Sequence, residues 1–223
     1  ERVSLVPPAA ERDGDMPHDE YYGSTAWRYE SLWIGGLKIW HGQGTYPYSA
    51  AGCAFLKLVA SRDGLSWRKV QFANEDDVPE VWIPNGPEGG GDGRNDGGYL
   101  TEFSQGPLRI GDELIYYYGA SSYGKNHPGP RRVSGGGIFR SRLRIDGFVS
   151  VDGGTLTTKP LSLRGERLCV NAAGPLRIAA LDARGELLGE ATIEGDSIRH
   201  EVSFSGKPIG RLASQKPVRL QFT

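Results

Sequence analysis

The chain has few cysteines, one methionine, no long apolar run and almost no net charge, and these shortages exclude several classes of protein. Its 223 residues include only two cysteines, so a disulfide-rich scaffold is excluded. No stretch approaches the ~18 consecutive apolar residues of a membrane-spanning helix. The formal net charge of −1 gives no overall basic field to attract nucleic acid or an anionic membrane. We therefore expect neither nucleic acid nor a membrane as a partner.

Glycine and aromatic residues are abundant instead. The sequence has 33 glycines, together with five Trp, ten Tyr and seven Phe. This many aromatic side chains is untypical of a disordered chain. Glycine in a helix interior costs about 1 kcal/mol relative to alanine. The composition therefore predicts an all-β fold in which tight turns join short strands.

Two segments of the chain repeat the same order of turns and strands. Asp19–Tyr22 and Asp96–Tyr99 each place a tyrosine three residues after an aspartate, ahead of an aromatic strand. Later in each segment an outer strand leads into an Asp-Gly turn, at Asp63 and at Asp146. A recurring unit of four antiparallel strands is the building block of a β-propeller. We therefore expect two blades, at 19–95 and 96–165.

Two blades alone do not close a propeller, which needs about four or more. Two explanations stay open: further blades precede Glu1, or the fold is a different β architecture. Residues 1–18 are expected to be a linker or the end of a preceding blade. After residue 165, five short strand-like runs separated by turn signals predict a small antiparallel β-sandwich over 166–223. The expected fold is therefore a partial β-propeller followed by a small sandwich.

The turn Ser61-Arg62-Asp63-Gly64-Leu65-Ser66-Trp67 resembles the S-x-D-G-x-x-W turn of five-bladed propeller glycoside hydrolases of the invertase, fructanase and arabinanase kind. It is also similar to the Asp-box of sialidases, although one residue shorter. The runs 111–119, 144–150 and 155–160 look like the later blades of such proteins. The resemblance implies a site at the mouth of a central channel, where three acidic residues from separate blades act. They would serve as nucleophile or base, as general acid, and as the residue that stabilises the transition state or tunes a pKa.

Three carboxylates are the catalytic candidates: Asp19, Asp96 and Glu102. Asp19 and Asp96 occupy matched positions where the two innermost strands begin, and period-2 counting puts Glu102 on the strand face of Asp96. The alternative for each aspartate is an ordinary turn residue. We expect no cofactor and no metal, because the glycine-rich loop 84–98 lacks calcium-loop spacing and no His/Cys cluster has zinc spacing. This loop is expected to be a flexible rim over the channel mouth.

Aromatic and polar side chains near these strands are the candidates for sugar binding. Flat apolar rings suit the C–H groups of a pyranose, and polar tips suit its hydroxyls. Packing in the core is the alternative for each of them. A second loop, 122–132, carries basic side chains, Lys125 among them, that suit an acidic sugar. The substrate-binding candidates are Glu20, Tyr22, Trp27, Trp40, His41, Tyr99, His127 and Arg131.

The sequence therefore predicts a carbohydrate-active protein, a glycoside hydrolase that acts on a poly- or oligosaccharide through acids at the channel mouth. Two alternatives stay open. One is a non-catalytic carbohydrate-binding or scaffold propeller, and the other is a chain that completes its sheet against another chain or an upstream segment. Carbohydrate is the expected partner, and this substrate class suggests an extracellular or periplasmic location.

Overall fold

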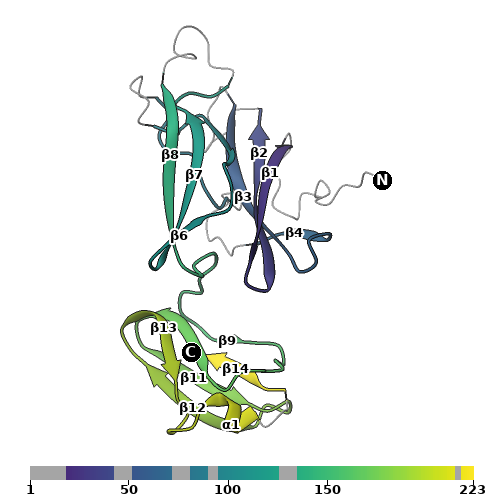
Figure 1. Ribbon diagram of the computed structural model, residues 1–223, viewed down its shortest axis with the longest axis vertical. Coiled ribbons are helices and arrows are strands. Elements are labelled where there is room, and N and C mark those ends of the chain that lie inside the picture. Colours follow the sequence, from purple (N-terminus) through teal and green to yellow (C-terminus); the bar gives the residue numbers. More distant parts are fainter. Residues whose placement is uncertain (1–18, 43–51, 72–80, 90–94, 126–134, 214–216) are drawn as a thin grey trace. The chain divides into compact units, whose positions relative to one another are not determined.

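The computed structural model describes residues 19–42, 52–71, 81–89, 95–125, 135–213 and 217–223 (Figure 1). Almost all regular structure in these ranges is β-strand, which confirms the predicted all-β class. The chain divides into two units, 1–143 and 144–223. The division therefore comes earlier than the expected boundary after residue 165. No helix in the described ranges is long and apolar enough to cross a membrane.

Unit 1 contains two antiparallel meanders that share one eight-stranded sheet. The strands of the first meander pair in chain order: β1 (Asp19–Tyr29), β2 (Leu32–His41), β3 (Cys53–Ser61) and β4 (Trp67–Lys69). The second meander is centred on β7 (Glu113–Ser121), whose partners are β5 (Tyr99–Phe103), β6 (Leu108–Ile110) and β8 (Gly136–Arg144). A parallel pairing of Ala54 with Tyr99 joins the two meanders.

The second meander lacks the strand expected after the Asp146 turn, because the chain after β8 belongs to unit 2. The Asn171 side chain donates a hydrogen bond to the Ile145 carbonyl at 2.6 Å. Further on, the Leu161 N–H donates to the Val218 carbonyl at 2.7 Å. These bonds draw residues 145–161 to the C-terminal strands, so the Asp146 turn does not lead into a further strand of the β7 sheet within the described residues.

The predicted Asp-Gly turn between β3 and β4 is built around one carboxylate. Asp63 Oδ1 accepts hydrogen bonds from the backbone N–H groups of Ser66 and Leu65, at 2.7 and 2.8 Å, and from the Ser61 hydroxyl at 2.9 Å. Gly64 takes a positive φ of 75°, which favours glycine. These bonds, those from Ser66 and Leu65 above all, lower the pKa of Asp63 from 3.8 to about 2. The motif therefore stabilises a hairpin, as the sequence predicts for an Asp-Gly turn.

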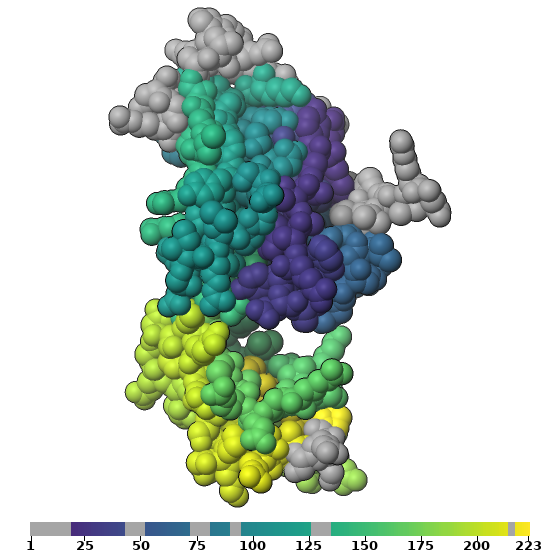
Figure 2. Space-filling view, viewed as in Figure 1, coloured from purple at the N-terminus to yellow at the C-terminus, as the bar shows by residue number. Residues whose placement is uncertain are grey.

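An aromatic core holds the two meanders together. Trp27 of β1 contacts Phe103 of β5 and Tyr116 of β7, with ring centroids 6.1 and 5.5 Å apart. Trp82 is hydrogen-bonded through its backbone to β3, and its ring centroid lies 5.6 Å from those of both Phe103 and Tyr116. The Thr25 hydroxyl donates to the Phe103 carbonyl at 2.9 Å, which ties β1 to β5. In Figure 2 the purple strands β1 and β2 and the teal strands of the second meander adjoin without a gap.

Unit 2 contains two antiparallel sheets. One pairs β10 (Leu168–Ala173) with β13 (Asp196–Val202). The other has the order β12 (Leu187–Ile193), β11 (Leu176–Leu181), β14 (Arg219–Phe222) and β9 (Leu156–Thr157). Both sheets contribute to one core. This core also contains Phe204, and it contains Ile209, the first residue of the short helix α1 (Ile209–Ala213). The strands predicted after residue 165 are therefore present, and β9 adds an earlier segment to them.

The Asp63 turn makes the stability of unit 1 depend on pH. Because the folded pKa of Asp63 is depressed, its stabilising effect is complete above pH 3.8 and is lost as the pH falls through about 2. We expect Asp63→Ala to lower the melting temperature by a few degrees at neutral pH, and the difference from the wild type to shrink as the pH falls toward 2. Circular dichroism melts over a pH series check this, with exposed Asp152→Ala as the control. A difference that does not change with pH would contradict the account.

Candidate functional site

The sheet of β1, β2 and β3 has two faces that carry different chemistry. Side chains alternate between the faces of a strand. Trp27, Lys38 and Trp40 lie on one face, which we call the aromatic face and which β5 covers in part. His41 lies on the opposite face, with the apolar side chains of Ile39 and its neighbours. The candidate residues are therefore divided between two environments.

A bulge in β1 places Tyr22 on the aromatic face. The register of β1 against β2 shifts between Tyr21 and Gly23, so Tyr22 is the extra residue. Bulges re-aim a side chain and often occur next to functional sites. Tyr22 is 41% exposed, and its ring lies 5.6 Å from the Trp40 ring and 6.5 Å from the Tyr99 ring. The tyrosines of the two repeated segments therefore meet at one point of unit 1.

Two lysines lie against these three rings. Lys38 Nζ is 4.2 Å from the centroid of the Tyr99 ring and 5.8 Å from that of Tyr22. Lys125 Nζ lies 5.0 Å from the Tyr22 centroid, 5.5 Å from Trp40 and 5.9 Å from Tyr99. An ammonium within ~6 Å of a ring centroid is attracted by the ring quadrupole. The Lys125 ammonium also donates a hydrogen bond to the Tyr22 hydroxyl at 3.3 Å.

Glu102 is the one catalytic candidate that reaches this cluster. Its Oε1 lies 3.5 Å from Lys38 Nζ, and its side chain is 33% exposed. Glycine at position 23 leaves room for this carboxylate, because a Cβ there would push the flexible end of the Glu102 side chain aside. A further bulge in β5, between Leu100 and Phe103, interrupts the alternation near Glu102. Glu20, directly opposite Trp40 in the register and exposed, places a further carboxylate on the same face.

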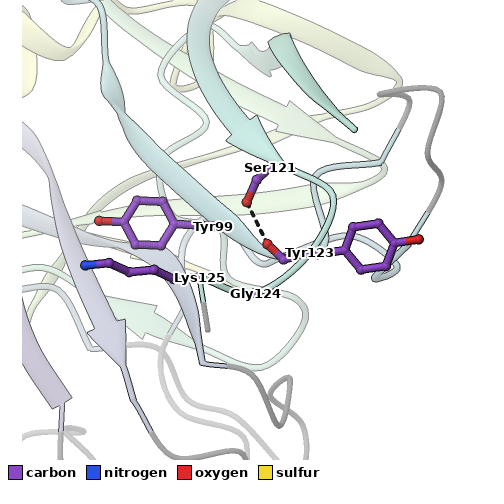
Figure 3. Close-up of a pocket in the computed structure, with 5 residues that line it drawn as sticks. All are labelled: Tyr99, Ser121, Tyr123, Gly124 and Lys125. Carbon is purple, nitrogen blue, oxygen red and sulfur yellow. Dashed lines mark hydrogen bonds between the residues drawn. The ribbon is translucent and has the colours of Figure 1, made fainter. Parts of the chain in front are cut away.

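A pocket of about 290 Å³ adjoins the cluster. It is lined by Tyr99 and Lys125, by Ser121 at the end of β7, and by Tyr123 and Gly124. Figure 3 shows the Tyr99 ring and the Lys125 side chain extending side by side, while the Tyr123 side chain points the other way. The Ser121 hydroxyl donates to the Tyr123 carbonyl at 2.7 Å, which fixes the turn after β7. The pocket thus lies next to the aromatic rings and shares Tyr99 and Lys125 with them.

Asp19 lies on the opposite face and is buried. Its side chain is 1% exposed, and its Oδ1 is bonded to His41 Nδ1 at 2.8 Å. Its Oδ2 lies 3.9 Å from Nζ of Lys57, which is equally buried. This carboxylate is therefore paired with two buried basic side chains, on the face opposite the aromatic face. His41, a substrate-binding candidate, is held in the same buried cluster.

Asp96 is also engaged inside unit 1. Its Oδ2 accepts a hydrogen bond from the Tyr118 hydroxyl at 2.7 Å. Because Asp96 precedes β5, counting in steps of two residues from Asp96 does not predict the strand face of Glu102. Burial raises the pKa of Tyr118, and the bond to Asp96 raises it further. Some described residues of the glycine-rich loop, the expected flexible rim, are packed here: Asn85 Nδ2 donates to the Ala54 carbonyl at 2.9 Å, and Gly98 is buried. Of the described loop residues, Gly97 and Gly98 are therefore packed against the sheet, whereas Pro84, Pro87 and Glu88 are exposed.

The structure corrects the prediction for Trp27, whose side chain is 9% exposed and belongs to the aromatic core. The alternative of core packing is the right one, because Phe103 and Tyr116 cover the ring from the second meander. His127 and Arg131 lie outside the described residues. The aromatic face thus brings together Glu20, Tyr22, Trp40, Tyr99 and Glu102 of the candidates predicted from the sequence.

Sequence reasoning did not select Lys38 as a site residue, and it named Lys125 as one of the basic side chains of loop 122–132 that suit an acidic sugar, without placing it beside the aromatic rings. Lys38 is 5% exposed and lies in the nearly continuous apolar run 34–40, which is typical of a strand buried on both faces. A lysine within such a run is the available signal, since buried lysines are rare unless they are paired. Gly23 carries no sequence signal of its own, because its role depends on Glu102 from a distant strand.

Comparison with known proteins assigns no family to the chain. No protein-family model matches the sequence. No curated protein is significantly similar to it. The resemblance to propeller hydrolases therefore stays an expectation from turn motifs, and the side chains of the aromatic face are the basis for a functional proposal.

The buried carboxylate of Asp19 gives a prediction about stability. Asp19→Asn removes the negative charge that faces His41 and Lys57, and breaking a buried ion pair on one side costs about 3–5 kcal/mol. Urea unfolding followed by tryptophan fluorescence measures this, because all five tryptophans lie within residues 27–82 of unit 1. The neighbouring exposed Glu20→Gln is the matched control and should change the free energy of unfolding by about 0.5 kcal/mol or less. Equal effects of the two variants would refute the structural role of Asp19.

Proposed function

We propose that unit 1 binds carbohydrate on its aromatic face. The observation that carries the proposal is the convergence of three rings, those of Tyr22, Trp40 and Tyr99, beside an open pocket. Sugar sites combine flat apolar faces with a few fixed polar groups. Here the polar groups are the Tyr22 hydroxyl, the Lys125 ammonium and the backbone of the turn 121–124.

The geometry favours stacking of a sugar ring on Tyr22. This ring is 41% exposed, whereas the side chains behind it, Lys38 in particular, are buried. Tyr22 is braced by contacts with the tilted Trp40 ring and with the Tyr99 ring, which meets it in a T-shaped geometry. A braced, exposed aromatic ring offers contact area at little cost in conformational entropy. This supports binding without turnover as the first function of the face.

Glycoside hydrolysis is the second candidate, and Glu20 and Glu102 favour it. Both carboxylates lie on the aromatic face, and such hydrolysis requires two carboxyl groups that flank the bond. Glu102, one-third exposed beside Lys38, is the candidate for the base or nucleophile. Glu20 would then act as the acid. Asp19 has no part in this proposal because it is buried on the other face.

We also propose that the two meanders are neighbouring blades of a propeller. This proposal is supported by the packing of one meander on the face of the other through the Trp27–Phe103 contact. Adjacent blades stack through their faces in such a fold, around a central channel. The pairing of Ala54 with Tyr99 adds a hydrogen-bonded link between the blades. In this arrangement the aromatic face lies between the two blades, where Tyr22 and Tyr99 meet.

Binding is tested with a pair of matched tyrosines. Tyr22 and Tyr117 are 41% and 38% exposed, but Tyr117 lies on β7 on the side away from buried Tyr116 and Tyr118. We expect Tyr22→Ala to weaken binding of oligosaccharides roughly fivefold to tenfold, as for truncation of an aromatic contact residue. Tyr117→Ala should leave the affinity unchanged. Calorimetric titration of a glycan panel measures both, and equal losses would contradict the proposed surface.

Turnover is tested separately from binding. If the chain hydrolyses a glycan, Glu102→Gln and Glu20→Gln should each lower the rate by about 100-fold or more, since general acid–base groups contribute this much. The control is Glu113→Gln, an exposed carboxylate paired with Arg142 at 3.6 Å. Release of reducing ends gives the rate. Binding with no release of reducing ends by the wild type would leave the protein a binder and reject hydrolysis.

A further inference from the structure

The charges of the aromatic face distinguish between classes of sugar. Lys38 is balanced by Glu102, whose Oε1 lies 3.5 Å from its ammonium. Lys125 differs, because within the described part of the chain no carboxylate lies within 4.0 Å of its Nζ. The nearby Glu88 carboxylate accepts the Gly124 N–H at 3.0 Å. The pocket therefore has one ammonium that the described residues do not neutralise.

Lys125 is held in place by the rings around it. Its ammonium lies within 6 Å of three ring centroids, those of Tyr22, Trp40 and Tyr99, and donates to the Tyr22 hydroxyl at 3.3 Å. A lysine on open surface loses side-chain entropy when it forms an ion pair, and such pairs are weak for that reason. A lysine already held by cation–π contacts loses less. The ammonium is therefore positioned before a ligand arrives.

The same rings argue against a cationic ligand. Three aromatic rings around one point can hold a quaternary ammonium. Here, however, the chain's own Lys125 occupies that position, and Lys38 lies 4.2 Å from the Tyr99 centroid. A further cation would meet the ammonium groups of Lys125 and Lys38, and the Glu102 carboxylate is already engaged by Lys38 at 3.5 Å. An anionic group on the ligand would instead be attracted by these ammonium groups.

We infer that Lys125 selects an acidic sugar, binding the carboxylate of a uronic acid whose ring stacks on Tyr22. The inference rests on the proposed carbohydrate binding and names its substrate class. The uronate carboxylate lies in the ring's own plane at its edge, so one residue can stack on an aromatic face and reach a neighbouring ammonium. Tyr22 and Lys125, which are in hydrogen-bond contact, provide those two groups at adjacent positions. Ser121 and Gly124 line the same pocket as Lys125.

The test compares each uronic-acid oligosaccharide with its carboxyl-reduced form, which keeps the sugar and replaces the carboxylate by a primary alcohol. The full chain is titrated with polygalacturonate, alginate and hyaluronate oligomers and their reduced counterparts at low ionic strength. At least one acidic oligomer should bind roughly threefold to tenfold more tightly than its reduced form. Added salt should weaken this preference, because screening reduces the attraction between partly exposed charges.

Three variants assign the preference to Lys125. Lys125→Gln should abolish the difference between acid and reduced form, while Lys125→Arg should retain it. Arg109→Gln removes a positive charge from exposed strand β6 and should change nothing. Equal affinity for both forms, or a preference that persists in Lys125→Gln, would overturn the inference and leave carbohydrate binding intact. If no glycan of the wider neutral and acidic panel binds, the proposed function itself fails, and the inference fails with it.

Discussion

Contact between the aromatic rings of the two meanders is the constraint on which the rest of unit 1 depends. Trp27, Phe103 and Tyr116 fill the space between β1, β5 and β7, and large buried aromatic side chains dominate the energetics of such contacts. This packing brings β5 across the face of β1 and β2, which places Glu102 beside Lys38 and Tyr99 beside Tyr22. No single strand contains the candidate site, so the site forms only because the core packs these strands together.

The β1–β3 sheet separates two kinds of charged cluster. On one face Asp19 is paired with His41 at 2.8 Å and is closed to solvent. On the other face Glu102 and Lys38 form a half-open pair among aromatic rings. Adjacent residues of one strand, Asp19 and Glu20, therefore have opposite roles, because strand alternation sends their side chains to opposite sides. The first face contributes a buried ion pair to stability, and the second is the face on which we propose recognition.

The strands and the Asp63 turn could be predicted from the sequence because their signals are local: alternating apolar runs and an aspartate that caps its own turn. The meeting of Tyr22 with Tyr99 could be anticipated only as a matching position in a repeat. The bulge at Tyr22 and the glycine that admits Glu102 were not predictable, since both depend on which strand lies opposite. The burial of Asp19 depends on Lys57, a residue of another strand. The early boundary at Arg144 arises in the same way, from bonds to Asn171.

The central claim is that a sugar ring stacks on Tyr22, beside the Trp40 ring that contacts it. Nuclear magnetic resonance of the five indole N–H groups tests it most directly, since one tryptophan lies at the site and four lie elsewhere in unit 1. Titration with the best-bound oligosaccharide should shift the Trp40 signal, assigned with Trp40→Phe, and leave the signals of Trp33 and Trp67 unchanged. A shift of Trp33 or Trp67 with no change at Trp40 would contradict the account.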